Sequence, residues 1–130
     1  MIEVVELKTS TLYLNKDQTH LGRCILAFHT HKKELFQLSN IELHSFMEEL
    51  SKVAKALQEA FNPQKINYAI YGDLVSHLHF HIVPKYENGR DWGEAFVNAP
   101  IQKKFVIESE YHQLIEKIKV QLEKEEEITW

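Results

Sequence analysis

The chain has 130 residues, of which 44% are hydrophobic and 26% are charged, and this composition is typical of one soluble globular domain with its own core. The formal net charge of −4 argues against a general nucleic-acid binder, which would carry a basic surface. The first ten residues contain acidic side chains and no long apolar run, so we expect neither a signal peptide nor a membrane span. We therefore expect a single domain over residues 1–130, a cytoplasmic enzyme or binding protein with no nucleic-acid or membrane partner.

The net charge does not exclude a small anionic ligand, because several basic side chains could form a local site. These are Arg23, Lys32, Lys33, Lys85 and Arg90. The only cysteine, Cys24, cannot form an internal disulfide, and it lies within the apolar run CILAF. We expect it to be a buried structural thiol rather than a nucleophile.

The first half of the chain predicts two strands and then a long helix. Residues 11–15 (TLYLN) and 23–28 (RCILAF) are typical of strands, and the polar loop KDQTHLG joins them. Ser39 stands three residues before Glu42, which is the spacing of a capping box at the start of a helix. An apolar stripe at helical spacing follows, and Pro63 should end the helix. The stripe, which we expect to pack in the core, consists of Leu43, Phe46, Met47, Leu50, Val53, Ala54, Leu57 and Phe61.

The second half predicts a pair of strands, a loop and a second helix. Residues 65–71 (KINYAIY) and 75–83 are expected strands, and a tight turn at residues 72–73 would make the pair antiparallel. Pro84 should end the second of them. After a loop that contains glycine and tryptophan, residues 103–107 (KKFVI) are expected to form a short strand before a capped helix. This order predicts an α+β fold with an antiparallel sheet of about five strands, a long central helix and a C-terminal helix.

The stretch SHLHFHIVPKY places three of the eight histidines within five residues. Side chains alternate between the two faces of a strand, so His77, His79 and His81 would share one face. A purely structural role is disfavoured, because each neutral imidazole needs a donor and an acceptor partner and an unsatisfied buried polar group costs about 1–3 kcal/mol. The pattern therefore indicates a chemical site.

Metal binding is one interpretation of this site, with His29 and His31 as a second His-x-His pair. Residues four apart on a strand are separated by about 13 Å along its axis, so His77 and His81 cannot readily share one ion with bonds of about 2.1 Å. The sequence has no Cys-x-x-Cys motif to complete such a site. A metal site would need two histidines of the triad and partners from elsewhere.

Nucleophilic catalysis is the other interpretation. A neutral imidazole attacks phosphorus well when a hydrogen bond at its second nitrogen orients the ring. Neighbours on the same face of the strand can direct donors to the oxygens that gain charge in the transition state. This interpretation explains why three histidines occur rather than one.

The run HLHFHIV at residues 77–83 resembles the signature of the histidine triad (HIT) family, His-φ-His-φ-His-φ-φ, where φ is apolar. The stretch GRCILAFHTHKKELFQLSNIEL is similar to the family's Gly-led strand, basic turn and capped helix, so that roughly residues 9–86 resemble the HIT core. Residues 87–130 would add a C-terminal loop, strand and helix. The stretch NYAIYGDLVSHLHFHIVPKY, followed by Asp91-Trp92-Gly93, resembles a bacterial branch often labelled diadenosine-tetraphosphate-hydrolase-like.

The resemblance implies a role for each histidine. The family's middle histidine attacks the α-phosphate of a nucleotide derivative, which implies that His79 is the nucleophile. The third contacts the phosphoryl group and the bridging oxygen, which implies that part for His81. The first belongs to the network that orients the nucleophile, which implies that part for His77. Asn15 stands where the family places an Asn or Asp that binds ribose hydroxyls, and the capping of a turn is the alternative for it.

Two positions depart from the family pattern and leave the substrate open. The family usually has an Asn-x-Gly loop and a Gln or Ser before the triad, and here the loop is shortened to Tyr71-Gly72-Asp73. The carboxylate of Asp73 would repel a phosphate unless it is protonated, paired or turned toward a leaving group. Arg23 occupies the place of the His usually found after Gly22. Asp73 and Arg23 are candidate nucleotide-binding residues together with Asn15.

These features predict an enzyme that cleaves a nucleoside phosphoramidate or a dinucleoside polyphosphate at the α-phosphate through a covalent nucleotidyl intermediate on His79. The alternatives are a nucleotide-binding module with little turnover and a metal-dependent hydrolase that uses the His-x-His pairs. The resemblance also implies a homodimer, to which the strand KINYAIY would contribute. No cofactor is expected to be required, although a divalent cation could accompany a polyphosphate substrate.

Overall fold

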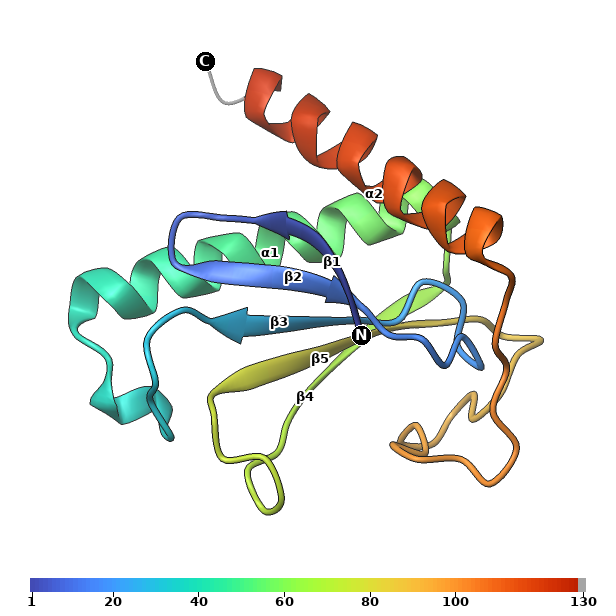
Figure 1. The fold of residues 1–130 in the computed structure, drawn as a ribbon, viewed down its shortest axis with the longest axis horizontal. Coiled ribbons are helices and arrows are strands. Elements are labelled where there is room, and N and C mark those ends of the chain that lie inside the picture. The colour runs from blue at the N-terminus through green and yellow to red at the C-terminus, as the bar shows by residue number, and fades with distance from the viewer. Residues whose placement is uncertain (129–130) are drawn as a thin grey trace.

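The computed structural model describes residues 1–128 and the side chains of residues 1–125. Over this part of the chain, five strands, one short 3-10 helix and two long helices follow one another (Figure 1). The elements are β1 (Ile2–Glu6), β2 (Ser10–Leu14), β3 (Cys24–Phe28), η1 (Leu35–Gln37), α1 (Asn40–Phe61), β4 (Lys65–Ile70), β5 (His79–Lys85) and α2 (Glu108–Ile128). Among the described helices, none is both long enough and apolar enough to cross a membrane.

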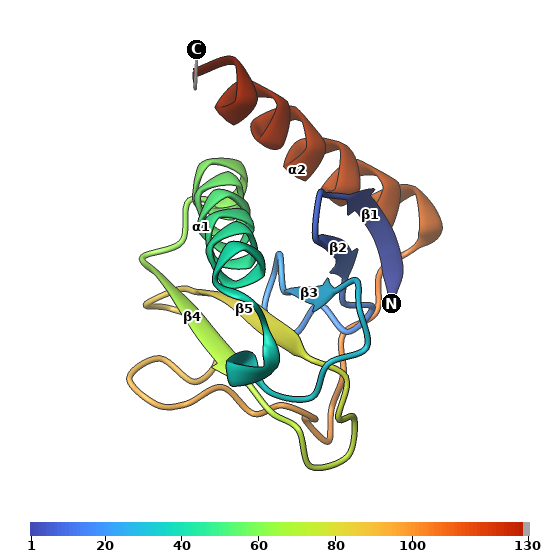
Figure 2. The same ribbon diagram turned by 90° about the vertical axis from the view of Figure 1, so that its left-hand side faces the viewer.

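The strands form one antiparallel sheet in the order β1-β2-β3-β5-β4. Helix α1 covers one face of this sheet, and α2 packs against α1 and β1 (Figure 2). The connection from β5 to α2, residues 86–107, crosses the opposite side of the sheet, and we call it the strap (Figure 2). The predicted α+β fold, with an antiparallel sheet of five strands, a long helix and a C-terminal helix, is confirmed.

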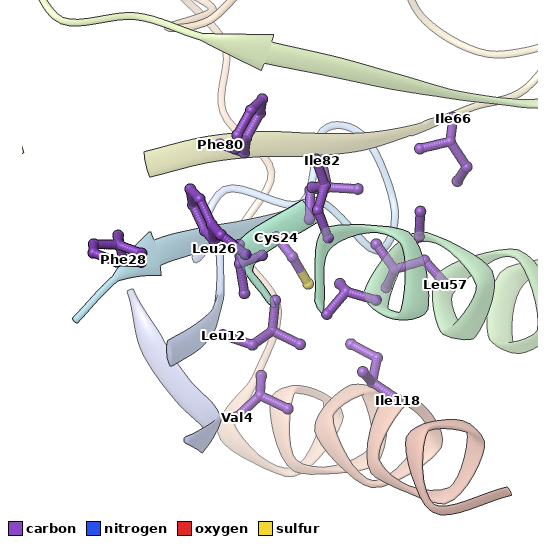
Figure 3. Close-up of a cluster of buried hydrophobic side chains, with 14 of the residues drawn as sticks. Val4, Leu12, Cys24, Leu26, Phe28, Leu57, Ile66, Phe80, Ile82 and Ile118 are labelled. Atoms are coloured by element: carbon purple, nitrogen blue, oxygen red, sulfur yellow. The ribbon is translucent and has the colours of Figure 1, made fainter. Parts of the chain in front are cut away.

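The core lies between the sheet and the two helices (Figure 3). Phe46 of α1 packs its ring against Phe28 of β3 and Phe80 of β5, with ring centroids 5.2 and 5.6 Å apart. Because successive residues of a strand point to opposite faces, His79 and His81 of β5 lie on the face away from α1. The apolar residues between the histidines therefore fix which way the histidines point.

Helix α1 begins with the predicted capping box. The backbone N–H of Glu42 donates to the Ser39 hydroxyl at 3.2 Å, and the backbone N–H of Ser39 donates to the Glu42 carboxylate at 2.8 Å. The helix ends at Phe61, and Asn62 takes the left-handed conformation (φ 49°) just before Pro63. The predicted stripe faces the core along the whole helix.

The predicted set of strands is wrong at both ends of the chain. Strand β1 was not predicted, because a register shift between Glu3 and Val5 interrupts its alternation. The expected strand at residues 103–107 is absent from the structure. Lys104 in that segment instead bonds the loop between β2 and β3, since its N–H donates to Asp17 Oδ1 at 3.0 Å and its carbonyl accepts from the Gln18 N–H at 2.7 Å.

The predicted boundaries of β5 are also wrong. The strand begins at His79 and continues through Pro84 to Lys85, and residues 71–78 form a longer connection in place of a tight turn. This connection is tied to the end of β3, because the Leu78 carbonyl accepts from the Phe28 N–H at 3.0 Å. Beyond Ile82 the strand pairs with β4 alone, and a proline is tolerated in a strand with one open side.

Candidate active site

A cavity of about 930 Å³ opens on the sheet face away from α1, and all three histidines of the triad line it. The alternation of β2 and β3 supplies its floor, which includes Thr11, Tyr13, Ile25 and Ala27. One wall is the connection between β4 and β5, with Tyr71, Leu74 and Val75, and the strap contributes Asn98. His77 lies just before β5, and it still faces the same cavity as the other two histidines.

The hydrogen bond of His79 fixes its tautomer. Nδ1 of its ring lies 2.7 Å from the backbone carbonyl oxygen of His77. A carbonyl oxygen only accepts, so Nδ1 carries a proton, and in the neutral ring Nε2 has the lone pair. No protein atom among the described residues bonds Nε2 of His79. The hydrogen bond at Nδ1 therefore fixes the orientation of the ring and leaves Nε2 available to a ligand.

His81 has the opposite tautomer. Its Nδ1 lies 3.2 Å from Nη2 of Arg23, and a guanidinium only donates, so Nδ1 holds the lone pair and Nε2 carries the proton. The rings of His79 and His81 stand edge to face with centroids 5.0 Å apart. Burial, the charge of Arg23 and the neighbouring His79 lower the pKa of His81 from 6.5 to about 4. The pair thus offers one nitrogen lone pair and one N–H donor side by side.

His77 links the triad to the end of β3. Its Nε2 donates to the Phe28 carbonyl at 2.6 Å, and Nδ1 of His31 lies 3.2 Å from its Nδ1. In the neutral His77 ring Nδ1 is an acceptor, and the proton of that contact then sits on His31. The side chain of His77 therefore anchors the segment whose backbone carbonyl bonds His79.

Arg23 lies behind His81 rather than in the cavity. Its side chain is 3% exposed and is not part of the cavity lining. Nη1 donates to the Asn98 carbonyl at 3.0 Å and Nη2 to Asn98 Oδ1 at 2.7 Å, and the guanidinium lies 5.1 Å from the centre of the Phe96 ring. The structure therefore places Arg23 against a triad histidine, whereas the sequence suggested it as a nucleotide contact.

Of the other two candidate nucleotide-binding residues, Asn15 lies outside the cavity and Asp73 lies in it. Asn15 is absent from the cavity lining, and its side-chain amide donates to the Asp17 carbonyl at 3.1 Å, which is the turn-capping alternative. Asp73 does line the cavity, and it is exposed.

Asp17, in the same loop as Asn15, has a lowered pKa. Burial alone would raise the pKa of Asp17, but hydrogen bonds from Thr19 and the Lys104 N–H, with the charge of Arg23, lower it.

The site contains residues that the sequence did not indicate. Asn98 and Phe96 reach Arg23 and His81 from a strap without a periodic pattern, so no sequence signal pointed to them. Thr11 and Tyr13 could have been found, because they alternate with the core residues of β2 and so face the histidines. The two histidines of the second His-x-His pair, His29 and His31, have different partners. Nε2 of His29 lies 3.1 Å from the Thr11 hydroxyl, while His31 contacts His77. Across the described residues, no group of three or more His, Cys, Asp or Glu side chains is placed to hold a metal ion.

Known proteins share this architecture. The HIT domain model matches residues 3–88, which extends the predicted core to include most of β1. The chain is 27% identical over 101 residues to adenosine 5'-monophosphoramidase hnt1 of Schizosaccharomyces pombe, a match that covers 77% of this chain and 76% of that protein. The fold is similar to that of histidine triad protein blr8122 from Bradyrhizobium japonicum, with a TM-score of 0.86 and 24% identity over 93% of this chain and 90% of that one. A histidine triad protein from Marinobacter aquaeolei VT8 has a TM-score of 0.85 and 23% identity, over 94% of this chain and 88% of that one. Because the family model spans more than half of the sequence and contains the whole triad, the chain belongs to the histidine triad (HIT) family.

Proposed function

We propose that the protein is a nucleotide hydrolase or transferase that cleaves a nucleoside phosphoramidate or a dinucleoside polyphosphate at the α-phosphate. The observation that carries the proposal is the pair of opposite tautomers on β5. His79 has a free lone pair at Nε2 because the His77 carbonyl holds its Nδ1 proton, and His81 has a free N–H because Arg23 occupies its Nδ1. A nucleophile beside a donor is the arrangement that covalent phosphoryl chemistry needs.

The reaction has two steps that use the same atoms. Nε2 of His79 attacks the α-phosphorus, the N–P bond forms, and the bond to the leaving group breaks with its electron pair going to that group. A water oxygen then attacks phosphorus, the N–P bond breaks, and its electron pair returns to Nε2 while the water proton passes to solvent. The N–H of His81 donates to an oxygen that gains charge, and the His77 carbonyl keeps the ring of His79 oriented in both steps.

The cavity walls support a nucleoside portion of the substrate. The floor and one wall present the apolar side chains of Ile25, Ala27, Leu74 and Val75, which suit the flat face of a base. Asp73 stands on the same wall, where its carboxylate would face hydroxyl or amine groups more favourably than phosphate. Assignment to the diadenosine-tetraphosphate-hydrolase-like branch, the cytoplasmic location, the homodimer and independence from a cofactor stay predictions.

Intact-mass measurement after rapid mixing with an adenylated substrate tests the proposal. We expect a nucleotidyl adduct on the wild-type protein and on His44→Ala, because His44 is exposed on α1. We expect none on His79→Ala. Nucleotide binding without any adduct or turnover in the wild type would identify a binding module instead.

A further inference from the structure

We propose that Arg23, clamped by Asn98, is a positioning residue that holds His81 as a neutral Nε2–H donor, and that this suits the site to leaving groups that depart without taking up a proton. The second half of this proposal rests on the proposed function. The first half concerns the free protein alone.

The hydrogen bonds of the guanidinium leave His81 one tautomer. Nη2 of Arg23 has two hydrogens, and its two acceptors are His81 Nδ1 at 3.2 Å and Asn98 Oδ1 at 2.7 Å. Nη1 is held by the Asn98 carbonyl at 3.0 Å. Asn98 of the strap therefore binds both terminal nitrogens of the guanidinium, Nη1 and Nη2. The second hydrogen of Nη2 is directed at the His81 ring. Arginine cannot accept a hydrogen bond, so a proton on Nδ1 of His81 is excluded in this arrangement.

The burial of Arg23 is costly, which argues for a role beyond filling space. The side chain is 3% exposed, its hydrogen-bond partners are neutral, and its Nε has no partner among the described residues. Asp17 acts on it only through its charge, and desolvation lowers the pKa of the guanidinium. An apolar side chain of similar length would fill the same space without this cost. Such an apolar side chain could not donate a hydrogen bond to His81 Nδ1.

Two of the groups that face His81, Arg23 and His79, disfavour the protonated ring. Arg23 comes from the loop before β3, His79 from β5 itself, and Tyr71 from the connection to β4, with ring centroids 5.5 Å apart. The strap adds Phe96, which is apolar and 6.2 Å away. None of the contacts to the ring is a carboxylate that could stabilise an imidazolium, and Asp73 on the cavity wall is exposed to solvent.

A neutral donor limits the leaving groups that the site can release well. The N–H of His81 can stabilise negative charge through a hydrogen bond, but giving its proton away would create an imidazolate. The electron pair of the broken bond must therefore stay on a group that is stable as an anion. A phosphate, sulfate or carboxylate meets this condition, whereas an amine does not unless solvent protonates it. The clamp thus favours mixed anhydrides, including dinucleoside polyphosphates, over phosphoramidates.

The first test follows the tautomer in the free protein. Long-range ¹H–¹⁵N correlation of protein with labelled histidines should show His81 with Nδ1 bare and Nε2 protonated from pH 5 to pH 8, with the signals identified by their loss in His81→Asn. Arg23→Lys keeps a donor and should keep this pattern. Arg23→Met should mix the tautomers and raise the pH of titration by at least one unit. Wild-type His81 protonated at Nδ1, or unchanged signals in a folded Arg23→Met, would overturn the proposal.

A second variant keeps the test informative if Arg23→Met does not fold. Asn98→Ala, at an exposed strap position, removes the Oδ1 acceptor of Nη2 and leaves Arg23 and its bond to the backbone carbonyl of residue 98 in place. We expect its His81 to titrate between the wild type and Arg23→Met. If Arg23→Met does not fold, an unchanged His81 in Asn98→Ala overturns the clamp.

The closing experiment compares leaving groups on one nucleotide. The wild-type kcat/KM should be larger for an adenylyl sulfate or a diadenosine polyphosphate than for an adenosine phosphoramidate of an alkyl amine. In Arg23→Met the ratio should move toward the amidate by at least tenfold. An unchanged ratio together with a changed tautomer would refute the leaving-group half. The expected tautomer in a protein that turns over neither substrate would leave the clamp standing and refute the proposed function.

Discussion

The two faces of the sheet are stabilised in different ways. On the face toward α1 the strands present mainly apolar side chains such as Leu26 and Ile82, which are fully buried, and the hydroxyl of Ser10, bonded to Glu49 of α1, is a buried polar exception. On the opposite face the buried groups include charged ones, and the strap satisfies them. Lys85, for instance, is 3% exposed and donates to the Glu94 carbonyl at 2.7 Å. The core face is thus stabilised mainly by the burial of apolar side chains of suitable size and shape, whereas the cavity face depends more on particular polar partners distant in sequence.

The largest effect should come from the cavity face. His79→Ala removes the nucleophile, and because the mechanism has no other route, we expect turnover to fall by at least three orders of magnitude. His44→Ala is the matched control on the other side of the molecule. Circular dichroism should show both variants folded, since neither ring belongs to the core. Activity of His79→Ala within tenfold of wild type would show that this ring is not the nucleophile.

A substitution on the core face should lower the stability of the fold, whereas His79→Ala should lower turnover. Phe46→Ala opens a cavity between α1 and the sheet, where its ring contacts Phe28 and Phe80, and should lower the free energy of unfolding by about 3–5 kcal/mol. Ile101→Ala removes an apolar side chain from the strap that is fully exposed, so it should change stability by less than about 0.5 kcal/mol. Urea unfolding measures both. Equal losses would mean that the strap contributes to stability as the core does.

The two faces also differ in how well the sequence predicted them. The capping box of Ser39 and Glu42 and the stripe that contains Phe46 are local or periodic, so α1 and its packing were predicted correctly. The alternation of His79 and His81 placed them correctly on one face. Nothing local, however, indicates that Arg23 reaches Asn98, 75 residues away.

The same distinction explains the misassigned elements. The segment at residues 103–107 has the composition of a strand, but the strap carries it to the loop that contains Asp17, where no strand is available to pair with it. Asn15 matched a family position by spacing, yet its side chain closes a turn. Contacts between a strap and a loop depend on the whole fold, so a reading of local pattern could not supply them.

The pH dependence of stability should report two buried histidines, His81 in the cavity and His20 in the loop between β2 and β3. Burial, Arg23 and His79 lower the pKa of His81 to about 4, and burial, partly offset by Asp91, lowers that of His20. A histidine with a lower pKa in the folded chain binds fewer protons there than in the unfolded chain. Its contribution is therefore complete above pH 6.5, the ordinary value, and is lost as the pH falls toward 4.

We expect the free energy of unfolding to drop by on the order of 1–3 kcal/mol between pH 6.5 and pH 4. Arg23→Met should make this drop smaller, because it removes a charge that disfavours the imidazolium. Urea titrations at several pH values measure the slope. A stability that is flat or rises over this interval would contradict a buried neutral His81.

The open edge of the sheet at β4 should mediate self-association. Strand β4 ends the strand order, and Tyr68 and Ile70 on it are 52% and 40% exposed. We predict a homodimer through this region, as the family resemblance implies. Sedimentation should give twice the 15.3 kDa chain mass, and Tyr68→Lys should shift the protein toward monomer. A wild-type monomer at micromolar concentration would contradict this.

The smallest effect should be that of chelation, and it separates the two chemistries that the histidines could support. If His79 is the nucleophile, excess EDTA should change turnover of an amidate substrate by less than about twofold, because no step in the site requires a metal. If His29 or His31 and part of the triad hold an ion, EDTA should abolish activity and one equivalent of zinc per chain should restore it. The structure gives these rings other partners, since His29 contacts Thr11 and His31 contacts His77. Both nitrogens of His77 are engaged as well, so a metal would have to break a contact at each ring that it bound. Loss of activity in EDTA with stoichiometric recovery would therefore contradict the hydrogen-bond network itself as well as the role of His79.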